Sequence, residues 1–327
     1  MHHAAIHFAE EIAHRSAAGE VWDLAWCSDM LDLASFKGLS KPAADLPAVL
    51  YFHENQFAYP LAGGEPVDYT YGFINATSAL AADAVWFNSA YNRDSFLEGW
   101  VDLVRRMKDA RPTAATERLR HKSTLQPQGI HPVSCGVAVE GPLRILWAAR
   151  WEHDKDPETF FSALRILAES ETPFRLSVIG EQFAESPAIF AEARTEFDAH
   201  ILHWGYQDSR AAYDAALREA DVVVSTARQE FFGVSVVEAA SAGAVPVLPR
   251  RLAYPEVWDE QEGPAVFFDG TAEDLASRLD ALAERKSAGD LQQDQRDQVS
   301  RITEPFWWSH LAPRLDAALE QVRGRED

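Results

Sequence analysis

The stretch VVVSTARQEFFGVSVVEAA, residues 222–240, decides the fold of this chain. Its three valines and Ser225 predict a buried parallel strand, because strands covered on both faces are continuously apolar. A polar turn follows, and Gly233 opens a helical pattern. A strand that leads into a helix through a glycine turn is typical of a βα unit, in which ligands bind beyond the carboxyl end of the strand.

Short apolar runs alternate with longer helical patterns on both sides of this stretch, which predicts parallel sheets covered by helices. In the second half, strands are expected at 144–148, 175–179, 200–204, 222–225, 245–248 and 265–267, and helices at 157–170, 186–196, 208–219, 233–243 and 271–284. In the first half, strands are expected at 21–27, 48–52, 84–88 and 123–126, and helices at 4–15, 68–82 and 90–108. The segment 306–322 has the pattern of a final amphipathic helix with an aromatic start.

Six prolines and glycines between residues 126 and 142 mark a linker between two α/β halves. The length of 327 residues fits two domains at about 150 residues each. We therefore expect an N-terminal Rossmann-like domain over 1–130, a C-terminal one over 143–305, and a helix over 306–327 that packs back toward the first domain.

The formal charge of −21 argues against broad binding of nucleic acid, which normally requires a basic surface. The exception is the segment 105–122, where seven Lys and Arg residues face only Asp109 and Glu117. Such a basic island is usually a solvated helix face, but it can also orient a nucleic acid at one edge of the protein.

No apolar run approaches the roughly 20 residues of a membrane span, and the first residues do not resemble a signal peptide. Cys27 and Cys135 are the only cysteines, which excludes a disulfide framework. A cytoplasmic location is therefore expected. His2, His3 and His7 lack further ligands of suitable spacing, so no metal site is expected.

Two carboxylates flank the glycine turn, since Glu230 precedes the helix and Glu238 lies one to two turns inside it. They can reach opposite ends of one elongated, hydroxyl-rich ligand. The helix start at Gly233 offers N–H groups and a positive dipole end to an anion. Arg150 and Lys155 follow the strand at 144–148 and can supply counter-charge to a diphosphate, although alone they would be read as solvated loop residues.

This spacing, with Phe-Phe-Gly after the first Glu, resembles the nucleotide-sugar site of retaining GT-B glycosyltransferases of the family 4 kind. The resemblance implies two Rossmann-like domains with a cleft between them and a donor in the C-terminal domain. Donor-binding residues are then expected to be Arg150, Lys155, Gly205, Tyr206, Phe232, Gly233, Val234, Ser235 and Glu238. Glu230 would hold the hexose, Glu238 the ribose, and Gly205–Tyr206 the nucleobase.

The run VLYFHENQFAYP, residues 49–60, is a strand that ends in three polar side chains, His53, Glu54 and Asn55. It resembles the signature of the tRNA-queuosine α-mannosyltransferases, as do residues 4–8, 68–72, 85–92 together with 95–97, and 150–155. That family transfers mannose from GDP-mannose to queuosine in the anticodon of tRNA-Asp, with no metal required. The resemblance implies a catalytic group of His53, Glu54, Asn55 and Glu230, and an acceptor side with Asn88, Ser89, Arg105, Arg106 and Arg120.

The family pattern begins with a further strand and a Gly-Gly-Ser-His turn, about one βα unit of 30 or more residues, ahead of Ala4. The N-terminal domain is therefore expected to lack its first βα unit. Two alternatives stay open. One is an enzyme of the same chemistry that acts on a small molecule, a lipid or a polysaccharide. The other is a truncated relative that binds nucleotide-sugar or tRNA without turnover.

Overall fold

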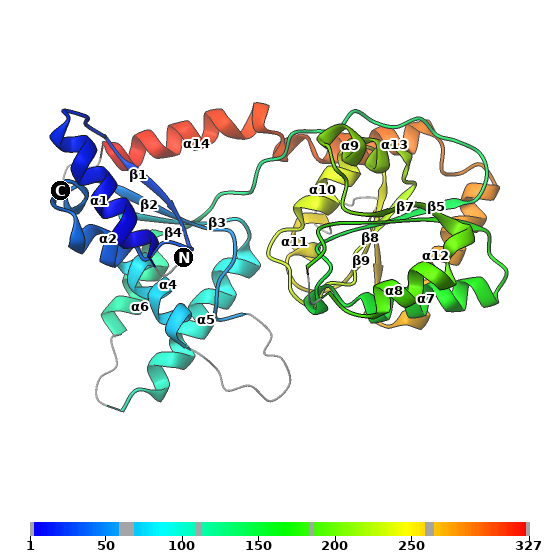
Figure 1. Cartoon of the computed structure of the whole chain (residues 1–327), viewed down its shortest axis with the longest axis horizontal. Coiled ribbons are helices and arrows are strands. Elements are labelled where there is room, and N and C mark those ends of the chain that lie inside the picture. The colour runs from blue at the N-terminus through cyan, green and yellow to red at the C-terminus, as the bar shows by residue number, and fades with distance from the viewer. Residues whose placement is uncertain (1–2, 59–68, 109–112, 184–185, 259–264, 325–327) are drawn as a thin grey trace. The chain divides into compact units, whose positions relative to one another are not determined.

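The computed structural model describes residues 3–58, 69–108, 113–183, 186–258 and 265–324. The chain divides into two compact units, one of residues up to Gln128 together with those from Leu311 onward, and one of Gly129–His310. Each unit is built around its own parallel sheet (Figure 1). The α/β class predicted from the alternation of elements is confirmed.

The first unit contains a four-stranded parallel sheet in the order β1-β2-β3-β4. Its side chains alternate between the two faces, so Leu50, Phe52 and Phe87 join the core beneath the helices while Tyr51 and Trp86 point to the other face. The strands are Ala25–Ser28 (β1), Ala48–Phe52 (β2), Ala84–Phe87 (β3) and Ser123–Leu125 (β4). The helices are Ala4–Ala17 (α1), Leu33–Leu39 (α2), Lys41–Ala44 (α3), Thr70–Ala81 (α4), Ala90–Arg106 (α5), Thr113–Lys122 (α6) and Trp308–Arg323 (α14), the last of which belongs to this unit from Leu311 on.

The second unit has a six-stranded parallel sheet in the order β10-β9-β8-β5-β6-β7. Helices α7, α8 and α12 cover one face, and α9, α10 and α13 the other (Figure 1). The strands are Leu143–Ala148 (β5), Phe174–Ile179 (β6), Ile201–Gly205 (β7), Val222–Val224 (β8), Val245–Pro249 (β9) and Val266–Phe268 (β10). The helices are Pro157–Glu169 (α7), Ile189–Glu196 (α8), Arg210–Glu219 (α9), Val234–Ser241 (α10), Tyr254–Trp258 (α11), Ala272–Ser287 (α12) and Gln293–Ile302 (α13).

The strand order of the second unit reverses between β5 and β8, because the chain adds β6 and β7 on one side and then returns to add β8 on the other. Ligands of doubly wound sheets bind beyond the carboxyl ends of the strands at such a point. The loops after β5 and β8 are therefore the expected place for a ligand.

The predicted elements differ from the structure mainly in the first unit. The first strand begins at Ala25 rather than Val21, which is 89% exposed. The helices α2, α3 and α6 were not predicted, and neither were α11 and α13 in the second unit. Most are short, and α13 is so polar that its pattern resembles a loop; helices of this kind depend on tertiary packing. Part of the predicted helix 68–82 lies outside the described residues.

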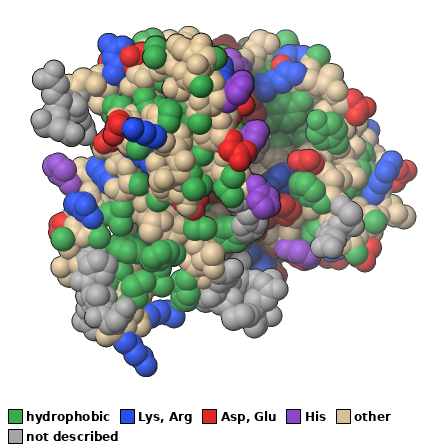
Figure 2. Space-filling view, turned by 60° about the vertical axis from the view of Figure 1, so that its left-hand side comes forward, with side chains coloured by type: hydrophobic (Ala, Val, Ile, Leu, Met, Phe, Trp, Pro, Cys, Tyr) green, Lys and Arg blue, Asp and Glu red, His purple; other side chains and the backbone are tan. Residues whose placement is uncertain are grey.

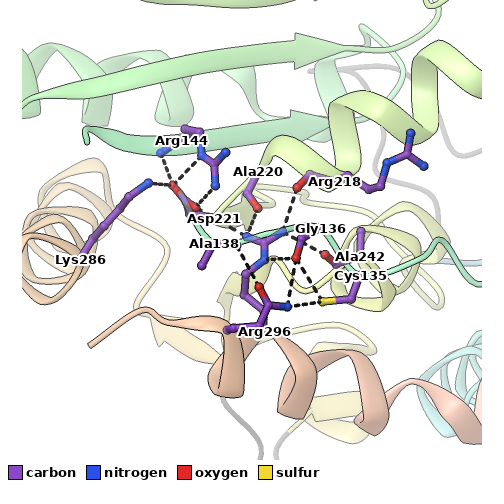
Figure 3. A network of polar contacts seen from close by, with 11 residues as sticks. Cys135, Gly136, Ala138, Arg144, Arg218, Ala220, Asp221, Ala242, Lys286 and Arg296 are labelled. Carbon is purple, nitrogen blue, oxygen red and sulfur yellow. Dashed lines mark hydrogen bonds and ion pairs between the residues drawn. The ribbon is translucent and has the colours of Figure 1, made fainter. Parts of the chain in front are cut away.

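A buried polar network joins the linker to the second unit (Figure 3). Arg296 of α13 donates from Nε to the carbonyl of Gly136 at 3.1 Å, and from Nη1 to the carbonyl of Ala220 at 2.7 Å. Its Nη2 donates to the carbonyls of Arg218 at 2.9 Å and Ala242 at 3.0 Å. One side chain thus binds carbonyl oxygens from the linker, the end of α9 and the end of α10.

Asp221 is the anion of this network. It forms ion pairs with Arg144 and Lys286, and its Oδ1 lies 3.6 Å from Nη1 of Arg296. Burial alone would raise the pKa of Asp221, but hydrogen bonds from Arg144 and Lys286 outweigh it and lower the pKa below its usual value. The network lies at the amino ends of β5 and β8, opposite the loops where a ligand is expected.

Candidate active site

The loops that follow β5 and β8 are bonded to each other. Val224 pairs with Trp147 at the ends of the two strands. Beyond them, the N–H of Arg228 donates to the carbonyl of Asp154 at 2.7 Å, and Thr226 Oγ1 donates to the carbonyl of Lys155 at 2.8 Å. The loop that carries Lys155 and the loop that leads to Glu230 are therefore joined directly by hydrogen bonds.

Lys155 is a nearly buried cation. Its side chain is 12% exposed, and Nζ donates to the carbonyl of Gln229 at 2.8 Å. Nζ also lies 3.0 Å from Asp154 Oδ2 and 3.7 Å from Glu230 Oε2. These contacts hold the ammonium group beside the segment that leads into α10.

The carboxylate of Glu230 accepts hydrogen bonds from the amide groups just before α10. Its Oε1 accepts hydrogen bonds from the N–H groups of Phe231 at 3.1 Å and Gly233 at 3.1 Å, with a longer contact from Phe232 at 3.4 Å. Gly233 makes the turn with a φ of +88°, and a Cβ there would lie 2.9 Å from the ring of Tyr254. Converging N–H groups at a helix start bind anions. An internal carboxylate therefore marks an anion-binding position beside Lys155.

Glu238 lies one turn into α10, on the partly exposed edge that it shares with Val234 and Ser235. Its Oε1 accepts from Nη1 of Arg210 at 2.9 Å, and its Oε2 accepts from the hydroxyl of Tyr213 at 3.0 Å. Burial and the neighbouring carboxylate raise the pKa of Tyr213, so its hydroxyl keeps its proton and acts as a donor.

Sequence reasoning missed Arg210 and Tyr213. Both lie on α9, and no local pattern shows that this helix packs beside α10. A basic residue and a tyrosine three positions apart in a first helical turn are the only signal, and that combination is common on exposed helix faces.

The remaining donor residues lie at the same edge of the sheet. Arg150 follows β5, is about half exposed, and pairs with Glu152 at 3.2 Å. Gly205 ends β7 with a φ of +88°, and Tyr206 after it is 65% exposed. The helix start at Gly233 and the loops after β5 and β7 thus leave the sheet in the same direction, since all strands are parallel.

In the first unit, His53 follows β2, and hydrogen bonds to its main-chain N–H and carbonyl fix its position. Its N–H donates to Asp29 Oδ1 at 3.0 Å, and its carbonyl accepts from Asn88 Nδ2 at 2.8 Å. Its side chain is 44% exposed and packs on the ring of Tyr51, with 4.5 Å between ring centroids. Beside it, Glu54 accepts a hydrogen bond from Gln56 at 3.2 Å. His53 is therefore well placed to contact a ligand.

Asn55, Asn88 and Ser89 are buried instead of lining an open surface. Asn55 is fully buried, and its amide donates to Asn92 Oδ1 at 2.9 Å, while Asn92 in turn donates to Asn88 Oδ1 at 2.8 Å. Ser89 caps α5 by accepting from the N–H of Asn92 at 3.0 Å. These side chains shape the loop that carries His53, and a direct contact with substrate would require their present hydrogen bonds to break.

Arg105, Arg106 and Arg120 are exposed at the ends of α5 and α6. Arg105 pairs with Asp102 at 3.3 Å, and Arg106 lies over the ring of Tyr69. Lys and Arg side chains occur in small separated groups on the face shown in Figure 2. Arg111 of the basic segment lies outside the described residues.

Lys122 is also part of the basic segment, but its ammonium group is used in hydrogen bonds within the fold. It donates to the carbonyls of Leu80 at 2.8 Å and Ala82 at 2.6 Å, at the end of α4. Burial lowers its pKa to about 8. Its ammonium group caps the end of α4, so this member of the basic segment contributes to the fold.

Within the described ranges, no three His, Cys, Asp or Glu side chains are grouped to hold a metal ion. His2 lies outside those ranges, and metal independence stays a prediction. None of the described helices combines the length and the apolar character needed to cross a membrane.

Two family models match the chain. Residues 1–130 match the model described as "tRNA-queuosine alpha-mannosyltransferase N-terminal", and residues 136–300 match "Glycosyl transferases group 1". The tRNA-queuosine alpha-mannosyltransferase of Drosophila melanogaster is 31% identical over 270 residues, which cover 79% of this chain and 70% of that protein.

Solved structures show the same fold at low sequence identity. Sucrose-phosphate synthase from Thermosynechococcus elongatus matches with a TM-score of 0.71 and 16% identity, over 96% of this chain and 77% of that one. Anabaena Alr3699/HepE in complex with UDP matches with a TM-score of 0.70 and 15% identity, over 96% and 82%. The chain has the GT-B fold, is a glycosyltransferase, and belongs to the tRNA-queuosine alpha-mannosyltransferase family.

Proposed function

We propose that this protein transfers mannose from GDP-mannose, with retention of configuration, to queuosine in the anticodon of tRNA-Asp. The observation that supports this most directly is the anion-binding position at the start of α10, where Glu230 and Lys155 meet. The acceptor and the sugar follow from the family, whose Drosophila member carries both in its name.

The protein's part in this reaction is electrostatic positioning. Arg150, Lys155 and the amide groups of Val234 and Ser235 in the first turn of α10 stabilise the departing GDP, which takes up the proton of the acceptor hydroxyl on the same face of the sugar. Glu230 binds mannose hydroxyls and Glu238 binds the ribose. His53 contacts the sugar or the acceptor near the anomeric carbon. These cations occupy the role that a divalent metal has in other transferases.

The direct test is incubation of the protein with GDP-mannose or UDP-sugars, and tRNA that contains queuosine, followed by mass spectrometry of the nucleosides. We expect a hexose on queuosine with GDP-mannose only, at an unchanged rate in EDTA. Matched tRNA with guanosine at the wobble position is the control. Turnover of another acceptor would favour the small-molecule, lipid or polysaccharide alternative, which the charge of −21 supports. Nucleotide binding without any turnover would favour the binding relative.

Tyr213→Phe should weaken donor binding about three- to tenfold, because it removes the hydroxyl that orients Glu238, a loss of about 1 kcal/mol. Calorimetric titration with GDP measures this directly. Tyr91→Phe, which alters another tyrosine whose pKa is raised by burial but which lies in the first unit, serves as the control. Equal affinities for wild type and Tyr213→Phe would show that Glu238 does not contact the nucleotide.

Replacing Arg105, Arg106 and Arg120 by Glu should weaken tRNA binding at low salt. It should also reduce the salt dependence of binding, because a complex with fewer phosphate contacts releases fewer counterions when it forms. Filter binding over a salt series gives both quantities. The matched control reverses Arg194, Arg278 and Arg285, three exposed arginines on helices of the second unit. If both triple variants bind equally well, the basic segment makes no contact with tRNA.

A further inference from the structure

Asp29 is a buried carboxylate next to the exposed ring of His53. It follows β1 directly and is 2% exposed. Its Oδ1 accepts the main-chain N–H of His53 at 3.0 Å and lies 3.5 Å from the ring nitrogen Nδ1 of the same residue. One carboxylate oxygen therefore faces both the backbone and the imidazole of His53.

Asp29 is itself held firmly. Its N–H donates to the carbonyl of Tyr51 at 3.1 Å, and its carbonyl accepts from Asn75 Nδ2 at 2.9 Å. The ring of Tyr51 supports the imidazole from another side and contacts Trp86, with 6.4 Å between ring centroids. The carboxylate and the surface on which the imidazole rests are thus both fixed by β1, β2 and β3.

The second carboxylate oxygen of Asp29, Oδ2, is buried and has no hydrogen-bond partner among the described residues. A buried carboxylate with an unpaired oxygen is costly to a fold. Stability alone does not explain a carboxylate here, because an asparagine side chain at this position would accept the same N–H without a buried charge. A negative carboxylate is instead a strong acceptor for a hydrogen bond from a protonated ring nitrogen, and Nδ1 of His53 lies 3.5 Å from Oδ1.

We propose that Asp29 is a positioning residue for His53. The carboxylate accepts a hydrogen bond from Nδ1–H of neutral His53, which leaves the ring's lone pair on Nε2 and directs that nitrogen away from the sheet as an acceptor for a substrate hydroxyl. The distance of 3.5 Å is longer than a hydrogen bond, as is common before a substrate is bound. This inference rests on the proposed role of His53 in glycosyl transfer.

Asp29→Asn should lower kcat for mannosyl transfer about ten- to a hundredfold, with the KM for GDP-mannose changed less than about twofold. Its amide oxygen can still accept the main-chain N–H of His53, but a neutral amide oxygen is a weaker acceptor for Nδ1–H than a carboxylate, so the preference for this tautomer is weakened. Asp83→Asn is the matched control. Asp83 accepts the N–H of Ala48 at 2.7 Å at the other end of β2, far along the strand from His53.

A double-mutant cycle separates positioning from general damage to the fold. If Asp29 acts through His53, Asp29→Asn should cause little further loss of kcat in the His53→Gln protein. A full additional loss in the double variant, or wild-type kcat in Asp29→Asn, would overturn the inference.

Nitrogen NMR of protein labelled with ¹⁵N only in histidine gives a test that needs no activity. The His53 signals, identified by their loss in His53→Gln, should show protonated Nδ1 in wild type and a larger share of protonated Nε2 in Asp29→Asn. An unchanged tautomer would overturn the role of Asp29. If the tautomer changes between wild type and Asp29→Asn but the wild-type protein transfers no mannose, the proposed function is contradicted and the Asp29–His53 pairing stays supported.

Discussion

Lys155→Ala should lower kcat for mannosyl transfer about a hundred- to a thousandfold, the range found when one preorganised electrostatic contact is removed from an active site. The leaving diphosphate carries more negative charge in the transition state than in bound GDP-mannose, so the loss should appear mainly in kcat and less in the KM for GDP-mannose. The side chain is 12% exposed, and a cation with so little water around it acts strongly on a neighbouring charge.

Steady-state kinetics with GDP-mannose, together with thermal unfolding of each variant, measure this effect. Lys155→Arg keeps the charge and should retain more activity than Lys155→Ala. Arg165→Ala removes a cation that pairs with Glu196 on the surface of the second unit and should leave kcat unchanged. A folded Lys155→Ala protein with normal kcat would show that the diphosphate departs elsewhere.

Arg296→Met should lower the free energy of unfolding by about 3–5 kcal/mol, because it leaves buried polar groups without their partner. Four carbonyl oxygens lose a donor, although those of Gly136 and Ala242 each keep a second one, and Asp221 loses one of its three cations. The substitution keeps the length and apolar stem of the side chain, so the loss reports mainly on the polar contacts.

Urea denaturation followed by tryptophan fluorescence measures the change. Arg165→Met is the control, since an exposed ion pair contributes only about 0–1 kcal/mol. The folded fraction of Arg296→Met should keep normal kcat, because the network lies at the amino ends of β5 and β8. A loss below about 1 kcal/mol would mean that water replaces the guanidinium group without cost.

The second unit could be predicted well from sequence because its strands are continuously apolar and its glycines mark the turns. Glu230, Gly233 and Glu238 belong to one local strand–turn–helix pattern, so their spacing alone indicated a helix start with two carboxylates. Tyr213 and Asp29 could not be found this way, because each meets its partner only through the packing of separate elements.

Asn55 and Asn88 illustrate a second limit. A polar residue at the end of a strand suggests a ligand contact, but the sequence does not show whether its hydrogen-bonding groups are already used. In the structure they are, by Asn92 and by the main chain of the loop. Lys122 shows the same limit for a charged residue. Its place in a basic segment indicates a solvated cation, but in the structure its ammonium group donates to a carbonyl at the end of α4.

In the second sheet, the contacts that stabilise the fold and the loops that carry the candidate donor residues lie at opposite ends of the strands. Ion pairs and the Arg296 contacts stabilise the amino edge of the sheet, whereas the loops that carry the candidate donor residues leave from its carboxyl edge. Mutations that retune the loops for another nucleotide or sugar therefore spare the contacts that keep the sheet folded. A protein arranged in this way can diversify its substrates over evolutionary time, and a protein engineer can exchange the loops while leaving the opposite edge untouched.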